Sequence, residues 1–228
     1  MPLKPRVGLI MATRDGLAPW KTTTRVLAEA KERNMEVAVA VDHRSTDGTE
    51  DAVRPLADHL IDFHNDVPYC EDVLDELTAS IRAPWCFLVS DDEWPSPALW
   101  KFAADAHRKE ALIYRPRMVA VLPDWSGHYR PLMTAQPRVF PRDSIRWPKG
   151  GIDILPLRAL PERDIAEVLW HFNLWSPRAE REAKVIAHEE AWQKNWDAHP
   201  WPAGSRRAYL WEDFPDEIGP LEDLEKYR

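Results

Sequence analysis

The sequence of 228 residues has no run of 18 apolar residues, so we expect no segment that crosses a membrane. Its N-terminal apolar stretch is too short for a secretory signal peptide, and we therefore expect a cytoplasmic protein. Cysteine is scarce: Cys70 falls on one face of a predicted helix, and Cys86 lies in a predicted core strand. We interpret both as small buried apolar groups rather than as a disulfide or a metal-binding pair.

The composition, with 44% apolar and 30% charged residues, is typical of a globular protein with a substantial core. A net charge of −8 argues against a general nucleic-acid binder. The charge is uneven, because ten basic residues face four acidic ones between residues 101 and 149. This basic region could hold phosphates or an anionic acceptor, or it could be a solvated face.

The most informative stretch, residues 83–97, joins a short apolar run to three carboxylates. Residues 85–89 are bounded by prolines and too few for a free-standing helix, which predicts a central strand of a parallel sheet. Asp91, Asp92 and Glu93 follow at its carboxyl end, where such sheets bind ligands. A divalent cation such as Mg²⁺ or Mn²⁺ would offset their mutual repulsion. An acidic turn capping a helix that begins near Ser96 explains the same residues.

Apolar periodicity elsewhere predicts alternating strands and helices that form right-handed βαβ units. The predicted strands cover residues 7–11, 37–41, 60–63, 138–140 and 167–172, with one or two more in 112–122, interrupted at Pro116. The predicted helices cover residues 20–34, 69–81 and 177–196, with short ones after Thr49 and Pro97. We expect one domain over residues 1–196, and an acidic, proline-containing arm over 197–228 that packs on it.

Ordered segments of this chain resemble the family 2 glycosyltransferases, which have the GT-A fold of the nucleotide-diphospho-sugar transferases. Met11-Ala12-Thr13-Arg14 is similar to the turn after the family's first strand. Residues 42–49 are similar to the family's Asp-Asp-Gly-Ser-Thr-Asp-Gly-Thr loop, and residues 89–94 are similar to its Leu-Asp-Ala-Asp-Glu-Trp motif. Residues 138–142, and residues 171–178 with Lys184, are similar to two later segments. The chain departs from the family at Ser90, and at His43 and Arg44, which stand where the family has Asp and Gly.

The resemblance implies an α/β fold of GT-A (Rossmann-like) type: a mostly parallel central sheet flanked by helices, with a C-terminal helix and an extended arm. It implies transfer of a sugar from a UDP-, GDP- or TDP-sugar to an acceptor hydroxyl on a glycan, a protein or a modified nucleic acid. The donor would contact Thr13, Arg14, Asp42, Ser45 and Asp91. Mn²⁺ or Mg²⁺ would bind Asp92 and His171, or be shared between Asp91 and Asp92 because Ser90 replaces the first acidic residue.

An inverting transferase needs a carboxylate that deprotonates the acceptor from the sugar face opposite the diphosphate. Asp153 is the predicted base, because it follows Gly150 and Gly151, has apolar neighbours, and stands where the family has Glu. Asp124 is the alternative.

Two other functions stay open. A sugar-phosphate nucleotidyltransferase would carry a glycine-rich, basic loop after the first strand, whereas residues 12–20 contain one Gly and one Arg. A non-catalytic relative that binds nucleotide sugars is conceivable because of Ser90.

Overall fold

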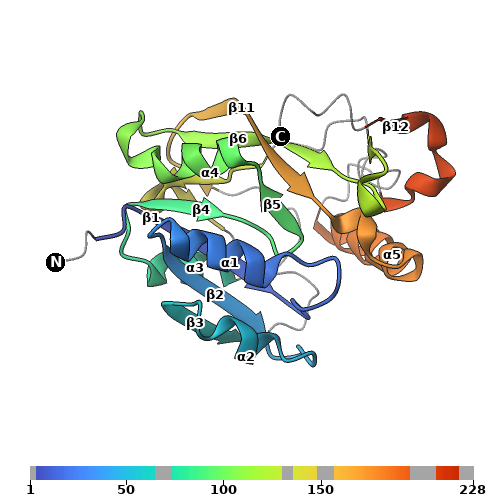
Figure 1. Cartoon of the computed structure of the whole chain (residues 1–228), viewed down its shortest axis with the longest axis horizontal. Helices are drawn as coiled ribbons and strands as arrows, with labels where there is room; N and C mark the ends of the chain where they lie inside the picture. Colours follow the sequence, from blue (N-terminus) through green and yellow to red (C-terminus); the bar gives the residue numbers. More distant parts are fainter. Residues whose placement is uncertain (1–3, 65–72, 130–135, 148–156, 196–208, 221–228) are drawn as a thin grey trace.

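The computed structural model describes residues 4–64, 73–129, 136–147, 157–195 and 209–220 (Figure 1). Its centre is an eight-stranded sheet in the order β3-β2-β1-β4-β8-β6-β11-β5, in which β8 and β5 run antiparallel to their neighbours. The predicted α/β class with a mostly parallel central sheet is therefore confirmed.

The strands of the main sheet are β1 (Val7–Thr13), β2 (Glu36–Asp42), β3 (His59–Phe63), β4 (Trp85–Leu88), β5 (Glu93–Pro95), β6 (Ile113–Ala120), β8 (Val139–Pro141) and β11 (Glu162–His171). Two small pairs join β7 (His128–Tyr129) to β12 (Ile218–Gly219), and β9 (Ile145–Arg146) to β10 (Leu157–Arg158). The α-helices are α1 (Thr23–Glu32), α2 (Thr49–Val53), α3 (Leu74–Ser80), α4 (Pro97–Ala104) and α5 (Arg178–Asn195). Short 3-10 turns cover Ala106–Arg108, Pro123–Trp125, Arg142–Ser144, Asn173–Trp175, Trp211–Asp213 and Pro215–Glu217.

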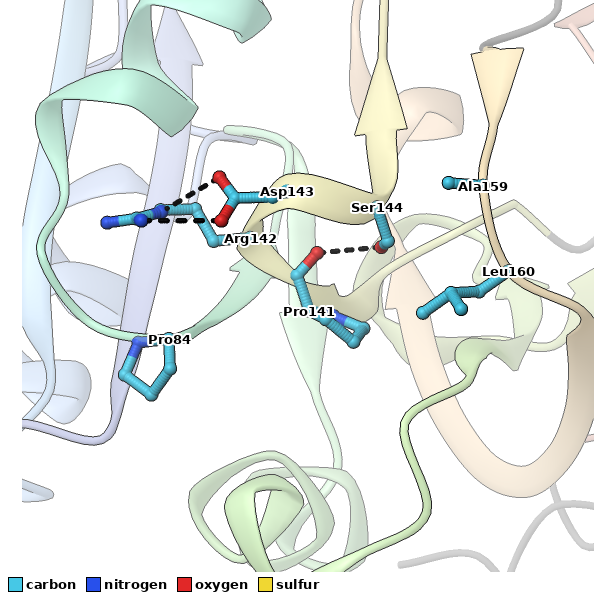
Figure 2. A pocket seen from close by; sticks show the side chains of 7 residues that line it. All are labelled: Pro84, Pro141, Arg142, Asp143, Ser144, Ala159 and Leu160. Atoms are coloured by element: carbon cyan, nitrogen blue, oxygen red, sulfur yellow. Dashed lines mark hydrogen bonds and ion pairs between the residues drawn. The ribbon is translucent and has the colours of Figure 1, made fainter.

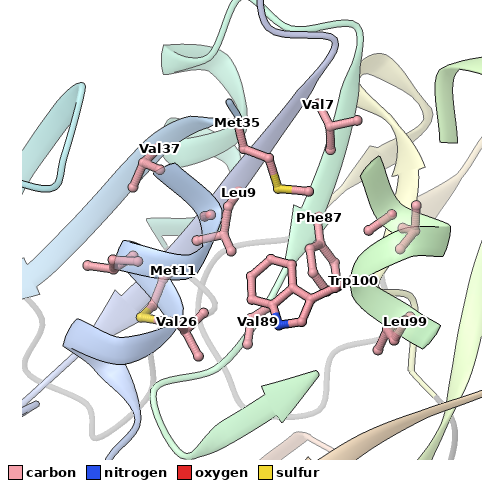
Figure 3. Packing of buried hydrophobic residues seen from close by; sticks show 14 of the residues in the cluster. Val7, Leu9, Met11, Val26, Met35, Val37, Phe87, Val89, Leu99 and Trp100 are labelled. Carbon is pink, nitrogen blue, oxygen red and sulfur yellow. The ribbon is translucent and has the colours of Figure 1, made fainter. Parts of the chain in front are cut away.

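Side chains of the central strands alternate between two buried layers, as a sheet covered on both faces requires. From β1, Leu9 and Met11 enter the layer covered by α1 and α4, whereas Ile10 enters the layer covered by α3. Figure 3 shows the first layer, where Phe87 of β4 meets the ring of Trp100 edge-on at 5.4 Å. Because both faces are buried, only the ends of these strands are left for polar chemistry.

Local sequence signals set the ends of two helices next to the central strands. The Ser96 hydroxyl accepts a hydrogen bond from the Leu99 N–H at 3.2 Å, and Pro97 occupies the first turn of α4. Asn34 has a left-handed φ of 54° just beyond α1, as predicted from its suitability for that conformation. The first helix itself begins at Thr23, three residues later than the apolar spacing predicted.

The predicted interruption at Pro116 is wrong, because β6 continues through it from Ile113 to Ala120. Pro116 has no N–H to donate to a neighbouring strand. The parallel partner β11 shifts register at this point: Ile165 lies opposite Pro116, and Val168 opposite Arg117. This bulge in β11 accommodates the proline without ending β6. β11 runs from Glu162 to His171, so it begins five residues before the predicted strand over residues 167–172 and ends one residue before it.

The described part of the C-terminal region, residues 209–220, packs against α5 and β7. Arg181 of α5 donates hydrogen bonds to the carbonyl oxygens of Tyr209 and Leu174, at 2.8 and 3.1 Å. Ile218 pairs with Tyr129 in the small antiparallel ladder of β12 and β7. The proposed boundary between residues 196 and 197 lies outside the described residues, and the division into domain and arm stays a prediction. Within the described helices, none is long and apolar enough to cross a membrane.

Candidate active site

Four strand ends bring buried polar side chains together at the carboxyl edge of the sheet. Thr13 ends β1, Asp42 ends β2, Asp92 follows β4, and His171 ends β11. All four side chains are buried, although each is polar. Burying such groups is costly unless each finds a partner, so their contacts indicate what the site can do.

Asp91 is held by the loop that follows β1. Its Oδ1 lies 2.7 Å from the Lys21 Nζ, and its Oδ2 accepts hydrogen bonds from the Thr13 hydroxyl at 2.9 Å and the Arg14 N–H at 3.3 Å. Burial lowers the pKa of Lys21, but the Asp91 and Asp92 carboxylates outweigh burial and hold that pKa above its ordinary value. Lys21 therefore carries a positive charge at this edge at neutral pH. No sequence signal pointed to it.

Asp92 and His171 face each other across the junction of β5 and β11. The Nε2 of His171 lies 3.3 Å from Oδ1 of Asp92, and the Phe172 N–H donates to the Asp92 carbonyl at 2.8 Å. Burial raises the pKa of Asp92, but His171, Lys184 and Lys21 outweigh it and hold that pKa well below its usual range. Asp92 is therefore an ionised carboxylate beside an imidazole.

Glu93 points away from this pair and into the protein. Its carboxylate forms a buried ion pair with Arg138 and accepts the Ser90 N–H at 2.8 Å. The three consecutive carboxylates thus do not share one cation, as their spacing had suggested: Asp91 pairs with Lys21, Asp92 with His171 and Glu93 with Arg138. The repulsion among them is offset by side chains of the protein.

A metal fits this edge only if a ligand supplies part of its coordination. Within the described residues, no group of three or more His, Cys, Asp and Glu side chains could hold a metal. Mg²⁺, however, is usually bound through one or two carboxylates together with substrate phosphates and water. Asp92 supplies a carboxylate and His171 an imidazole, and the two already lie in contact. This set fits a divalent cation that is shared with a phosphorylated ligand.

Asp42, the predicted contact for the nucleoside, is enclosed by its own loop. Its Oδ1 accepts the Arg44 N–H at 2.9 Å, and the Arg44 guanidinium binds both carboxylate oxygens through Nε and Nη2. Burial raises the pKa of Asp42, but the hydrogen bonds and charge of Arg44 outweigh it and lower that pKa. Arg44 stands where the resembled loop has Gly, but the sequence does not show that its side chain would bind Asp42.

The loops after β1 and β2 are joined by hydrogen bonds. The Asp15 N–H donates to the Ser45 hydroxyl at 3.1 Å, and the Gly16 N–H donates to the Thr49 hydroxyl at 2.7 Å. Asp15 has a left-handed φ of 48° at this junction. Arg14 lies beside it with a half-exposed side chain. The predicted donor contact Thr13 therefore ends β1, whereas Arg14 and Ser45 lie on the adjoining loops, and Ser45 also fixes one loop on the other.

The predicted catalytic base could not be placed. Asp153 lies outside the described residues, and so does the side chain of the alternative, Asp124. Asp153 remains a prediction.

A hollow of about 270 Å³ lies elsewhere, beside Pro84, Pro141 and Leu160 (Figure 2). Arg142 and Asp143 form an ion pair at its rim. Pro84 precedes the first residue of β4, whereas Asp91 and Asp92 follow its last. The hollow is therefore at the opposite edge of the sheet from the buried carboxylates.

Comparisons with known proteins show the fold. No family model matches the sequence, and no curated protein matches it. A solved structure described as a mycobacterial protein superposes with a TM-score of 0.51 at 16% identity, covering 77% of this chain and 69% of that one. Glucosyl-3-phosphoglycerate synthase from Mycobacterium tuberculosis, with Mg²⁺ and UDP, superposes with a TM-score of 0.50 at 14% identity, covering 81% and 76%. The inositol-1-phosphate CTP transferase from T. maritima gives 0.45 at 12% identity, covering 75% and 90%. The two superpositions with TM-scores of 0.51 and 0.50 show that the chain has a GT-A-type fold.

Proposed function

We propose that this protein is a metal-dependent glycosyltransferase that moves a sugar from a nucleoside-diphosphate donor to an acceptor hydroxyl with inversion. The observation that carries the proposal is the contact between Asp92 and His171, at 3.3 Å, on the edge where β1, β2 and β4 also end. These residues are far apart in sequence, and the fold brings them together where parallel sheets bind ligands.

Asp92 and His171 would hold Mg²⁺ or Mn²⁺, which would neutralise the negative charge that develops on the departing diphosphate. Lys21 would add a positive charge next to the proposed metal site. Its ion pair with Asp91 holds the Lys21 ammonium group there, and Asp91 is in turn held by hydrogen bonds from Thr13 and Arg14. Thr13, Arg14 and Ser45 would bind the donor from the joined loops, and Asp42 would orient the nucleoside. The acceptor proton would pass to Asp153.

The first test measures donor binding with and without metal. Isothermal titration with UDP-, GDP- and TDP-sugars should show at least one whose affinity rises about tenfold or more when Mn²⁺ is added. Asp92→Asn should abolish that gain, because it removes the ionised ligand while conserving shape. Asp143→Asn is the matched control, since its carboxylate is exposed at the opposite edge. An unchanged metal effect in Asp92→Asn would exclude this pair as the metal site.

The second test concerns the base. Asp153→Asn should lower the rate of transfer by orders of magnitude, with little change in donor affinity, because it removes only the proton acceptor. Release of the nucleoside diphosphate in the presence of candidate acceptors measures the rate. A rate near that of the parent protein would show that another group takes the proton. Donor binding without any turnover of the parent would favour a non-catalytic relative, and pyrophosphate release from a nucleoside triphosphate would favour a nucleotidyltransferase.

A further inference from the structure

We infer that Lys21 bonds the diphosphate of the donor directly, and that Asp91 is a positioning residue that acts through Lys21. Asp91, an expected donor contact, would then bind the donor only by way of this lysine. The inference rests on the proposed function, because it concerns the diphosphate of the same donor.

The Asp91 carboxylate is already occupied by donors from the protein. Its Oδ1 lies 2.7 Å from the Lys21 Nζ, and its Oδ2 accepts hydrogen bonds from the Thr13 hydroxyl at 2.9 Å and the Arg14 N–H at 3.3 Å. A carboxylate offers about four acceptor positions, so these contacts use most of them. A diphosphate is itself an anion that accepts hydrogen bonds, and it cannot take the place of these donors. The Asp91 carboxylate therefore has no direct way to bind it.

The Lys21 ammonium group, in contrast, has donors to spare, because a protonated lysine carries three N–H groups. Within the part of the chain that the structure describes, the carboxylate of Asp91 is the hydrogen-bond partner of the Lys21 Nζ. The Lys21 side chain is 18% exposed, so water reaches the ammonium group only in part. Its remaining donors need acceptors, and phosphate oxygens are acceptors that also carry negative charge.

Lys21 also lies beside the proposed metal site. Burial lowers the pKa of Lys21, but the carboxylates of Asp91 and Asp92 outweigh burial, which places Lys21 within electrostatic reach of Asp92. Asp92 in turn lies 3.3 Å from the Nε2 of His171. A diphosphate that shares a cation with Asp92 and His171 would therefore lie next to Lys21. The three rotatable donors of a lysine suit the oxygens of such a ligand.

The loop between β1 and α1 fixes the backbone from which this lysine projects. The Lys21 N–H donates to the Ala18 carbonyl at 2.8 Å, which closes the turn before it. Directly after it, Thr22 donates to the Asp91 carbonyl from its N–H at 2.7 Å and from its hydroxyl at 3.1 Å. Asp91 thus holds the lysine at both ends: its carbonyl binds the neighbouring backbone, and its carboxylate binds the ammonium group. This is the arrangement of a residue that positions another.

The experiment is an isothermal titration of the whole protein with UDP, GDP and TDP, with and without Mn²⁺. Lys21→Met should lower the affinity for the diphosphate that the parent binds about tenfold or more, because it removes a charged hydrogen bond to the phosphate. The gain in affinity from Mn²⁺ should remain, since Asp92 and His171 are unchanged. Lys21→Arg should recover most of the lost affinity, because a guanidinium also donates to phosphate oxygens.

A double-mutant cycle tests the positioning role of Asp91. Asp91→Asn should weaken diphosphate binding in the parent but add nothing further in a Lys21→Met background, because Asp91 acts through the lysine. Losses that add in full would mean that Asp91 contacts the donor itself, and would overturn that role. The double variant leaves no bare carboxylate buried. Should Lys21→Met fail to fold, the double variant must therefore still bind the diphosphate more weakly than Asp91→Asn does, or the inference fails.

Lys31→Met is the matched control, because the Lys31 Nζ lies the same 2.7 Å from the Asp58 Oδ1, but in the last turn of α1, whereas Lys21 precedes the first. It should leave the affinity unchanged. Diphosphate affinity in Lys21→Met equal to that of the control would overturn the inference, and would leave Lys21 as a counter-ion of Asp91 alone. A tenfold loss in Lys21→Met without any effect of Mn²⁺ on the parent would support the role of Lys21, while the proposed metal site fails. If the parent binds none of the three nucleotides, the proposed function fails, and this inference fails with it.

Discussion

Replacing Arg138 with methionine should remove about 3–5 kcal/mol from the free energy of unfolding, because it leaves the Glu93 carboxylate buried without its charge partner. The Arg138 side chain is 5% exposed and that of Glu93 is 1% exposed, so water cannot replace the guanidinium. Glu93 also accepts the N–H of Ser90, directly before Asp91 and Asp92. The same substitution should therefore loosen the segment that carries the proposed metal ligand.

Urea denaturation of the parent and the variant measures this loss. In thermal unfolding of a chain of this size, each kcal/mol of lost stability lowers the midpoint temperature Tm by about 2–4 °C. The Tm of Arg138→Met should therefore be about 6–20 °C below that of the parent. Arg163→Met is the control: its ion pair with Glu110 is at the surface, where the two side chains are 55% and 64% exposed, and it should cost no more than about 1 kcal/mol.

A double variant separates the charge from the packing. Glu93→Gln with Arg138→Met removes both charges, and the glutamine still offers an acceptor to the Ser90 N–H. It should recover more than half of the lost stability, since no bare charge stays buried. The Nε of Arg138 has no hydrogen-bond partner among the described residues, so the native pair is itself imperfectly satisfied. A loss for Arg138→Met as small as that of Arg163→Met would refute the reasoning.

Three further outcomes follow from buried contacts. Gly8→Ala should cost about 1–3 kcal/mol in urea denaturation, because its Cβ would stand 2.4 Å from the Ile81 Cγ2. A Gly8→Ala cost that persists undiminished in an Ile81→Ala background would contradict the clash. The pKa of Asp42 is lowered in the folded protein, so its pairing stabilises above the unfolded carboxyl pKa near 4 and is lost as the pH falls through the lower folded value. Asp42→Asn should therefore flatten the loss of stability on acidification, and a slope equal to the parent's below pH 4 would count against that pairing. Burial raises the pKa of the Cys86 thiol, so a thiol reagent should label at most one cysteine in the native protein and two after unfolding. Rapid labelling of both cysteines in the native protein would mean that Cys86 in β4 is accessible to solvent.

The sequence predicted the strands of the core because their signal is local. β1, β2 and β4 are short apolar runs bounded by turn residues, and each lies within two residues of its predicted range. The error at Pro116 has a non-local cause. A proline ends a strand unless its neighbour adapts, and here β11 adapts by a bulge between Ile165 and Val168. Nothing near Pro116 in the sequence records that bulge.

The site divides in the same way. Thr13, Asp42 and Asp92 could be assigned to one edge because parallel strands of one sheet end together. Their partners could not, because an ion pair depends on which loops approach in space. Lys21 lies in a loop without periodicity, and the direction of the Arg44 side chain is set by a turn whose hydrogen bonds are not evident from composition. The sequence motifs therefore located the edge of the sheet where the carboxylates lie, and the structure identified the side chains that neutralise those carboxylates.

The identity of these partners bears on which carboxylate could exchange its protein contact for a metal. The protonated ammonium group of Lys21 and the guanidinium group of Arg138 have no free lone pair with which to coordinate a metal. Neither can therefore join its partner, Asp91 or Glu93, as a metal ligand. A neutral imidazole can coordinate a metal through a ring nitrogen, which makes His171 different from Lys21 and Arg138. A divalent cation at Asp92 would keep both members of the pair, whereas a cation at Asp91 would have to displace a lysine and two further hydrogen bonds. Ser90 also stands where the motif that residues 89–94 resemble has its first acidic residue, so we keep the proposed metal site on Asp92 with His171 rather than on Asp91 with Asp92.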